Sequence, residues 1–185
     1  MKGKKQKGAT VKDEIERIAV VGAGIMGHAI AQEYARAGFQ VHLNDVSEER
    51  LQLAIDNVQS NLERLVDLGL AQREQVVPAL ARLHTTTRLE EAVSEADVVV
   101  EVIPEKLAPK QQLFLQLDQM CPTHTILASN TSTILPSNLA SATTRPDKVV
   151  VTHYMVPPYL LPFVEVVRGP ATSDKTVEIL SLIHI

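Results

Sequence analysis

The sequence is poor in several residues on which whole classes of protein depend. Its 185 residues include one cysteine, no tryptophan and only 3% aromatic residues. The lone cysteine, Cys121, excludes an intramolecular disulfide and a zinc site built from several cysteines, and it fits the reducing cytoplasm. The shortage of aromatic side chains argues against a stacking platform for single strands, and the net charge of −4 argues against a general nucleic-acid binder.

Long apolar runs are also missing. No stretch approaches the roughly 18 apolar residues that cross a membrane. The first apolar run, residues 18–25, follows three acids and one arginine, whereas a signal peptide begins with a positive segment and has a longer apolar run. We therefore expect a cytoplasmic protein with no membrane or nucleic-acid partner. With 45% apolar residues, the chain is long enough to bury a core.

Positive charge is concentrated at the start of the chain. The lysines that precede the first acid, Asp13, are Lys2, Lys4, Lys5, Lys7 and Lys12. A short arm of lysine, glycine and glutamine is most simply a solubilising, disordered tail, so residues 1–14 are predicted to lie outside the fold. Residues 15–179 then have the length of one domain.

Segments typical of strands and helices alternate along this domain. Apolar, often β-branched runs predict strands at residues 18–21, 41–45, 84–87, 97–102, 125–128, 149–152 and 163–167. Apolar residues at helical spacing predict helices at residues 25–37, 48–68, 72–80 and 108–120. Apolar strands that alternate with helices favour a parallel α/β sheet. We predict a Rossmann-type, doubly wound, mostly parallel sheet with a helical pair inserted after the second strand.

A glycine motif follows the first predicted strand. Gly22, Gly24 and Gly27 have the spacing G-x-G-x-x-G, where a strand ends and a helix begins. The first glycine permits a tight turn, the second lets the backbone approach a pyrophosphate, and the third permits close contact of helix and sheet. The helix N-terminus, with Ile25 and Met26, offers N–H groups and a positive dipole end to the phosphates. These residues are predicted to bind a dinucleotide.

Asp45 ends the second predicted strand. A carboxylate in this place can accept hydrogen bonds from both hydroxyls of the adenosine ribose, and it would repel a 2′-phosphate. No lysine or arginine follows before Arg50, so NAD is favoured over NADP as the cofactor. The alternative is that Asp45 only begins a turn ahead of Ser47.

Three features in the second half of the chain could supply acid–base chemistry. The turn from Ser129 to Ser132 follows a predicted strand, and His153 ends another. Ligands bind beyond the carboxyl ends of strands in an open parallel sheet. Glu165 interrupts an apolar run and is expected to be partly buried, so it needs a partner, and an imidazole suits it. Glu165 would then orient His153 as a general base.

Simpler interpretations of these three residues stay open at this point. Glu165 could face water on an edge strand, His153 could be an ordinary residue at a strand end, and Ser132 could be a helix N-cap. Spacing alone does not decide between these interpretations and the catalytic one.

In their order along the chain, the motifs resemble those of the NAD-dependent 3-hydroxyacyl-CoA dehydrogenases. The resemblance runs from about Arg17 to Asp174 and includes GAGIMGHAIA, VEVIPEKLAPKQQLF, ILASNTS, THYMVPP and PFVEVVRG. It implies an enzyme that interconverts (S)-3-hydroxyacyl-CoA and 3-oxoacyl-CoA with NAD. It also implies that His153 is the catalytic base, that Glu165 is its partner and that Ser132 contacts the substrate oxygen near the nicotinamide.

Further contacts follow from the same resemblance. Asn130 belongs to the same turn as Ser132, and Glu105 and Lys110 match positions near the nicotinamide ribose. Without the resemblance, Glu105 and Lys110 would be interpreted as a solvated helix N-terminus with an exposed lysine. Asn61 opens a helical segment that matches the family's CoA-contacting helix, and it is predicted to bind the substrate.

The sequence departs from the family pattern near the substrate. Val156 stands where the family usually has asparagine. The helix over residues 61–68 holds Glu63 and Asp67 beside a single arginine, which is a poor match for CoA phosphates. The alternatives are an NAD-dependent dehydrogenase of a small 3-hydroxy acid, of the L-gulonate or carnitine type, and a non-catalytic NAD-binding module.

The C-terminal end of the sequence also departs from the family. Family members continue into an all-helical domain that supplies part of the acyl site and a homodimer interface. Residues Leu180 to Ile185 do not resemble the family and are predicted to be a non-native tail. We therefore expect a fragment that binds NAD with little or no turnover.

Overall fold

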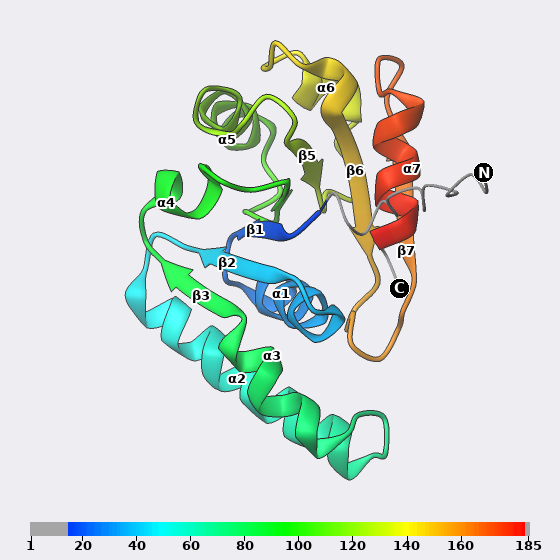
Figure 1. Cartoon of the computed structure of the whole chain (residues 1–185). Helices are drawn as coiled ribbons and strands as arrows, with labels where there is room; N and C mark the ends of the chain where they lie inside the picture. Colours follow the sequence, from blue (N-terminus) through cyan, green and yellow to red (C-terminus); the bar gives the residue numbers. More distant parts are fainter. Residues whose placement is uncertain (1–14, 184–185) are drawn as a thin grey trace, which may run out of the picture.

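Seven strands form one sheet in the order β3-β2-β1-β4-β5-β6-β7 (Figure 1). The computed structural model describes residues 15–183. The strands are β1 Arg17–Val21, β2 Gln40–Asn44, β3 Leu83–Thr86, β4 Val98–Glu101, β5 Ile126–Ser129, β6 Val149–Tyr154 and β7 Val164–Arg168. Strands β1 to β6 are parallel, and β7 is antiparallel to β6. The predicted Rossmann-type sheet is confirmed. The predicted tail, residues 1–14, lies outside the described residues.

The strand order reverses between β1 and β4. From β1 the chain builds the sheet outward to β2 and β3, and then crosses back to place β4 on the other side of β1. In an open parallel sheet, the crevice beyond the carboxyl ends at this reversal is where ligands bind. Gly22 follows the end of β1, Asp45 follows the end of β2, and Ser132 lies in the loop after β5. The topology therefore gathers these predicted site residues at one edge of the sheet.

Helices cover both faces of the sheet. One apolar core lies under α1 (Ile25–Ala37), α2 (Glu48–Asp67), α3 (Val76–Ala81, after a 3-10 turn at Arg73–Gln75) and α7 (Asp174–Ile183). A second core lies under α4 (Leu89–Val93), α5 (Leu107–Met120) and α6 (Pro136–Ala140). Helices α2 and α3 lie side by side and form the predicted helical pair (Figure 1). None of the helices within residues 15–183 is both long and apolar enough to cross a bilayer.

Three helices lie where the sequence predicted none. Helices α4 and α6 have five residues each, too few for helical periodicity to be recognised. Helix α7 follows Ser173, whose hydroxyl accepts the N–H of Thr176. It continues past the predicted domain end at residue 179, and Leu180 is fully buried. The non-native origin of residues 180–185 stays a prediction.

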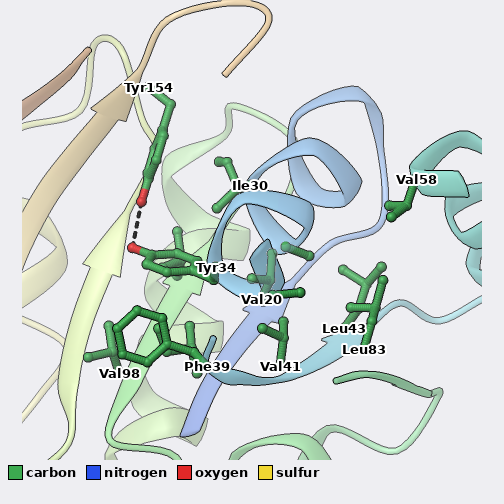
Figure 2. Close-up of a cluster of buried hydrophobic side chains, with 14 of the residues drawn as sticks. Val20, Ile30, Tyr34, Phe39, Val41, Leu43, Val58, Leu83, Val98 and Tyr154 are labelled. Carbon is green, nitrogen blue, oxygen red and sulfur yellow. Dashed lines mark hydrogen bonds between the residues drawn. The ribbon is translucent and has the colours of Figure 1, made fainter. Parts of the chain in front are cut away.

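Two buried tyrosines join α1 to β6. The hydroxyl of Tyr154 lies 2.5 Å from the hydroxyl of Tyr34, and their rings meet edge to face (Figure 2). Burial raises the pKa of both phenols well above the usual value, so both stay neutral at physiological pH. The contact holds the helix that follows the glycine motif against the strand that carries His153.

Replacement of Leu180 tests whether α7 belongs to the core. Because this side chain is fully buried, we expect Leu180→Ala to lower the free energy of unfolding by about 2–5 kcal/mol. Glu178→Ala, at an exposed position of the same helix, is the matched control and should change it by less than about 0.5 kcal/mol. Urea unfolding followed by circular dichroism measures both values. Equal values for the two variants would contradict the buried position of Leu180.

Candidate active site

Two glycines of the motif stand where no other residue fits. Gly22 has a φ of +111°, and a Cβ on it would lie 2.9 Å from the carbonyl oxygen of Val102. A Cβ on Gly27 would lie only 1.7 Å from the carbonyl oxygen of Gly22. The first turn of α1 therefore packs against the end of β1 only because residue 27 is glycine, as the motif predicted.

Gly24 faces open space instead. A Cβ there would meet no atom within 4 Å. Gly24 is the N-cap of α1, and this helix has neither a side-chain cap nor an acid in its first turn. Beside it, the side chain of Ile25 is 78% exposed. Open space in front of uncapped N–H groups and a positive dipole end fits a dinucleotide phosphate.

Asp45 makes one contact with the glycine turn and one with the turn that follows β2. Its Oδ2 accepts the N–H of Ala23 at 2.9 Å, and its Oδ1 accepts the N–H of Ser47 at 3.2 Å. The carboxylate thus begins the turn before Ser47, which was the alternative to a role in cofactor binding. It also ties the end of β2 to the glycine motif. Each carboxylate oxygen can accept more than one hydrogen bond, so acceptor capacity remains for ribose hydroxyls. The guanidinium of Arg50 lies 3.9 Å from Oδ1.

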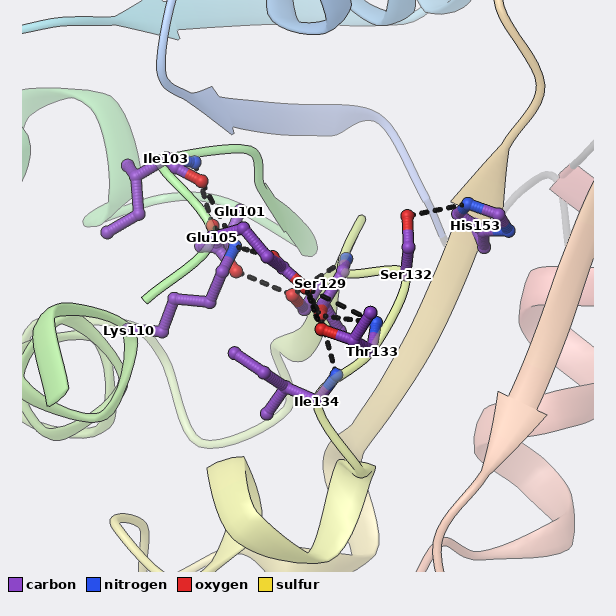
Figure 3. Close-up of polar contacts among 10 residues, drawn as sticks. Glu101, Ile103, Glu105, Lys110, Ser129, Ser132, Thr133, Ile134 and His153 are labelled. Carbon is purple, nitrogen blue, oxygen red and sulfur yellow. Dashed lines mark hydrogen bonds and ion pairs between the residues drawn. The ribbon is translucent and has the colours of Figure 1, made fainter. Parts of the chain in front are cut away.

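Ser132, His153 and Glu165 form a hydrogen-bonded chain. His153 Nε2 lies 3.0 Å from Ser132 Oγ (Figure 3), and His153 Nδ1 lies 2.9 Å from Glu165 Oε2. The register of β6 and β7 makes His153 and Glu165 cross-strand partners, while Ser132 follows β5. A proton on Nδ1 that is donated to Glu165 leaves the Nε2 lone pair free to accept another proton. The structure thus brings together the three predicted catalytic residues.

Of the simpler interpretations, the one for Glu165 is correct in part and the one for Ser132 is wrong. The side chain of Glu165 is 49% exposed because β7 is an edge strand, so this carboxylate is less buried than the apolar run suggested. Facing water on an edge strand and pairing with the imidazole are therefore both true of it. Ser132 is not a helix N-cap, since α6 begins at Pro136 and its N-cap is Leu135.

Asn130 holds two strand ends together. Its Oδ1 accepts the N–H of Tyr154 at 2.9 Å, and its own N–H donates to the carbonyl oxygen of Glu101 at 2.9 Å. The predicted contact of Asn130 with the cofactor stays a prediction. In the structure, the side chain of Asn130 aligns the loop after β5 with the strand that carries His153.

A buried ion pair lies beside the Ser132 loop. Lys110 Nζ is 2.5 Å from Glu101 Oε1, and both side chains are almost wholly buried (Figure 3). Lys110 is thus not the exposed lysine of the simpler interpretation. Burial raises the pKa of Glu101, although Lys110 and neighbouring donors oppose that rise. Glu101 was not predicted as a site residue because residues 97–102 have the pattern of an apolar strand. The signal that could have revealed it is an acid at the end of a run of valines.

Glu105 adds a second carboxylate to the pair. It lies 3.4 Å from Lys110 and accepts hydrogen bonds from the hydroxyls of Thr131 and Thr133. Partial burial raises the pKa of Glu105, but the two hydroxyls and Lys110 outweigh it and hold the pKa below the usual value. Glu105 is therefore an ionised carboxylate at neutral pH.

Asn61 remains apart from the other predicted site residues. It lies in the second half of α2, which packs on α1, α3 and β3. Within residues 15–183, no hydrogen bond joins its side chain to the Ser132 loop or to His153. Its predicted role in binding the substrate stays a prediction.

These features define a dinucleotide-binding domain of the Rossmann class: the glycine turn, the uncapped helix and the acid after β2. All three lie where the strand order of the doubly wound sheet reverses. A family model described as "3-hydroxyacyl-CoA dehydrogenase, NAD binding domain" matches residues 17–183. The chain belongs to this family, and its cofactor is NAD.

The individual similarities agree with this assignment. The chain is 42% identical over 163 residues to a probable 3-hydroxybutyryl-CoA dehydrogenase of Bacillus subtilis, covering 88% of the chain and 56% of that protein. The crystal structure of 3-hydroxybutyryl-CoA dehydrogenase from Escherichia coli K12 has a TM-score of 0.87 at 36% identity, covering 91% of this chain and 36% of that one. A diketoreductase that acts on dicarbonyl compounds has a TM-score of 0.85 at 29% identity, covering 92% and 60%. The chain thus spans about half the length of the curated relatives it matches.

Two glycine variants separate packing from ligand binding. Gly27→Ala places a Cβ inside the carbonyl group of Gly22, so we expect it to prevent folding or to lower the unfolding temperature sharply. Gly24→Ala meets no protein atom, so it should keep the unfolding temperature but weaken NAD binding by about tenfold or more. Thermal unfolding and calorimetric titration with NAD measure the two effects. A Gly27→Ala variant with unchanged stability would contradict the close packing of α1 on β1.

Proposed function

We propose that the chain is the cofactor-binding half of an enzyme that interconverts (S)-3-hydroxyacyl-CoA and 3-oxoacyl-CoA. The observation that carries this proposal is the hydrogen-bonded chain of Ser132, His153 and Glu165 beside the predicted NAD site. The names of the Bacillus subtilis and Escherichia coli proteins support a 3-hydroxyacyl-CoA as substrate. Because those relatives are longer than this chain, the substrate site is expected to need the part that they carry beyond the matched region.

The glycine motif and Asp45 would hold NAD. Gly22, Gly24 and Gly27, with Ile25 and Met26 in the first turn of α1, would face the pyrophosphate. Asp45 would accept hydrogen bonds from the adenosine ribose. When bound, NAD supplies the acceptor for the hydride that leaves the β-carbon of the hydroxyacyl group.

His153 would move the proton. In the oxidative direction, its Nε2 removes the proton of the substrate's 3-hydroxyl, and in the reverse direction the imidazolium returns it. Ser132 Oγ, 3.0 Å from Nε2, would hold the substrate oxygen next to that nitrogen. Glu165, 2.9 Å from Nδ1, fixes the orientation of the ring and stabilises the imidazolium.

Further proposals concern the whole protein. We expect a homodimer formed through the part that the relatives carry beyond the matched region. Light scattering on the full-length protein that contains this chain tests the dimer, and a monomer would contradict it.

We also propose a location in the cytoplasm. The chain's one thiol, Cys121, is buried and free, which fits the reducing conditions there.

Replacement of His153 tests the proposed mechanism. In the full-length protein that contains this chain, His153→Asn should reduce the rate of NADH oxidation with acetoacetyl-CoA by about 10²–10⁴-fold, because the variant lacks the proposed acid–base group. His84→Asn, on the exposed side of the opposite edge strand, is the matched control and should have no such effect. The loss of NADH absorbance measures both rates. Full activity of His153→Asn would refute the catalytic assignment, and an inactive parent protein would refute the proposed reaction.

Replacement of Asp45 tests cofactor selection. Asp45→Asn removes the charge that would repel a 2′-phosphate, so the ratio of NAD to NADP affinity should fall by about tenfold or more. Asp56→Asn, which removes an exposed carboxylate of α2, controls for the change in net charge. Calorimetric titration of the chain with each dinucleotide measures the ratio. An unchanged ratio would show that Asp45 does not face the ribose.

A second candidate is the oxidation of a small 3-hydroxy acid, of the L-gulonate or carnitine type. Two observations favour it: the last turns of α2 carry the exposed acids Glu63 and Asp67, and the structure resembles a diketoreductase. An acidic helix repels the phosphates of CoA. Activity on L-gulonate or carnitine, together with none on acetoacetyl-CoA, would select this candidate.

A further inference from the structure

Two histidines lie side by side at the end of the sheet away from β7. His42 of β2 and His84 of the edge strand β3 are partners in the parallel register of these strands. The strand residues next to them, Val41, Leu43 and Leu83, belong to the core under α1 and α2. Because side chains alternate along a strand, both imidazoles lie on the other face of the sheet, where α4 packs on β2 and β3.

The spacing of the two rings fits a shared metal ion. Their centroids are 5.4 Å apart, and the ring planes make an angle of 67°. Two imidazoles on one zinc ion, with zinc–nitrogen bonds of about 2.0–2.1 Å at a tetrahedral angle, have their centroids about 5 Å apart. The strand register therefore brings the two rings to the separation that a common ion requires.

The protein already fixes one nitrogen of His42. A hydrogen bond joins its imidazole to the backbone of Ala92 in α4. Imidazoles that bind metals generally donate one N–H to such a partner, which orients the ring and leaves the other nitrogen for the ion. Partial burial, His84 and Arg17 lower the pKa of His42, while the contact with Ala92 and the charge of Glu91 oppose this. The imidazole is therefore neutral at neutral pH and has a free lone pair.

Glu91, the acid that acts on His42, is engaged by other groups. Its Oε2 accepts the hydroxyl of Thr86 at 2.9 Å and the Nε–H of Arg88 at 2.8 Å, so we do not assign it as a ligand. Within residues 15–183, no group of three or more histidine, cysteine, aspartate or glutamate side chains could hold a metal. The two imidazoles would be the protein ligands, and water would complete the coordination.

We propose that His42 and His84 form a two-histidine binding site for a divalent transition-metal cation of the Zn²⁺ or Ni²⁺ type. Imidazole nitrogen suits these ions, whereas Mg²⁺ and Ca²⁺ prefer oxygen ligands. A bound ion would link β2 to the edge strand β3 in addition to their backbone hydrogen bonds. Because the pair lies at the end of the sheet away from His153, the inference does not rest on the proposed function.

Titration of the whole chain with ZnCl₂ tests this site. We expect saturable binding of one ion, which shifts the ¹⁵N signals of the imidazoles of His42 and His84 together. MgCl₂ at the same concentration should leave both signals unchanged. At saturation with Zn²⁺, hydrogen exchange of the amides of β3 should slow by about tenfold, because the ion stabilises the paired state of the edge strand.

Two variants remove one ligand each. His84→Asn, at an exposed position, and His42→Asn, at a partly buried one, should each weaken Zn²⁺ affinity by about tenfold or more in calorimetric titration. His124→Asn is the matched control, since it removes an exposed imidazole that contacts Asp97 instead. It should change the affinity by less than about twofold. If His42→Asn fails to fold, the exposed His84→Asn variant decides the result.

Three outcomes would overturn the proposed site. Equal Zn²⁺ affinities of the parent chain and His84→Asn would leave the pair as an ordinary edge-to-face contact of two rings. Zn²⁺ that shifts the signals of His124 or another histidine, and not those of the pair, would place the ion elsewhere. Binding of Mg²⁺ as tight as that of Zn²⁺ would contradict coordination by imidazole nitrogen.

Discussion

The geometry of the site depends on the contact between the first turn of α1 and the end of β1. The carbonyl oxygen of Gly22 occupies the space where any side chain at position 27 would begin. This contact sets the path of α1 across the sheet and leaves its uncapped N-terminus at the reversal of strand order. Further along the same helix, the hydroxyl of Tyr34 meets that of Tyr154, the residue after His153. One helix therefore contacts both the glycine turn and the strand of the proposed base.

Buried charge lies beside the loop that carries Ser132. Glu101 and Lys110 are both removed from water, and a buried ion pair of this kind adds little stability compared with apolar residues of similar volume. Its hydrogen bonds are directional, however, and they reach β4, α5 and the end of β5 at once. The pair therefore ties β4, α5 and the end of β5 together through directional hydrogen bonds, in a way that apolar contacts do not.

The three candidate catalytic residues come from separate parts of the chain and meet through sheet pairing. His153 and Glu165 face one another because β6 and β7 pair in antiparallel register. Ser132 joins them because β5 pairs with β6 and the loop after β5 turns toward that strand. The same edge position of β7 that permits the pairing also leaves Glu165 half exposed.

The sequence by itself determined the features that depend on local physics. Glycine spacing, apolar strands and helical periodicity were sufficient for the doubly wound sheet, the dinucleotide turn and the helical pair, because each reflects neighbouring residues only. The five-residue helices α4 and α6 were not predicted, because so few residues do not repeat the helical period often enough for it to be recognised. Strand-end position and an acid inside an apolar run made Ser132, His153 and Glu165 candidates, and the resemblance to a known family favoured the catalytic interpretation over the simpler ones.

Only the tertiary structure decided which charged groups are buried and what they contact. Lys110 looked like a solvated residue, and Glu101 went unnoticed at the end of a strand, because burial depends on segments far apart in the sequence. The fold brings Glu101 of β4, Lys110 of α5 and Ser129 of β5 within hydrogen-bonding distance. A charge removed from water must find such partners or change its protonation, and only the packed sheet supplies them here.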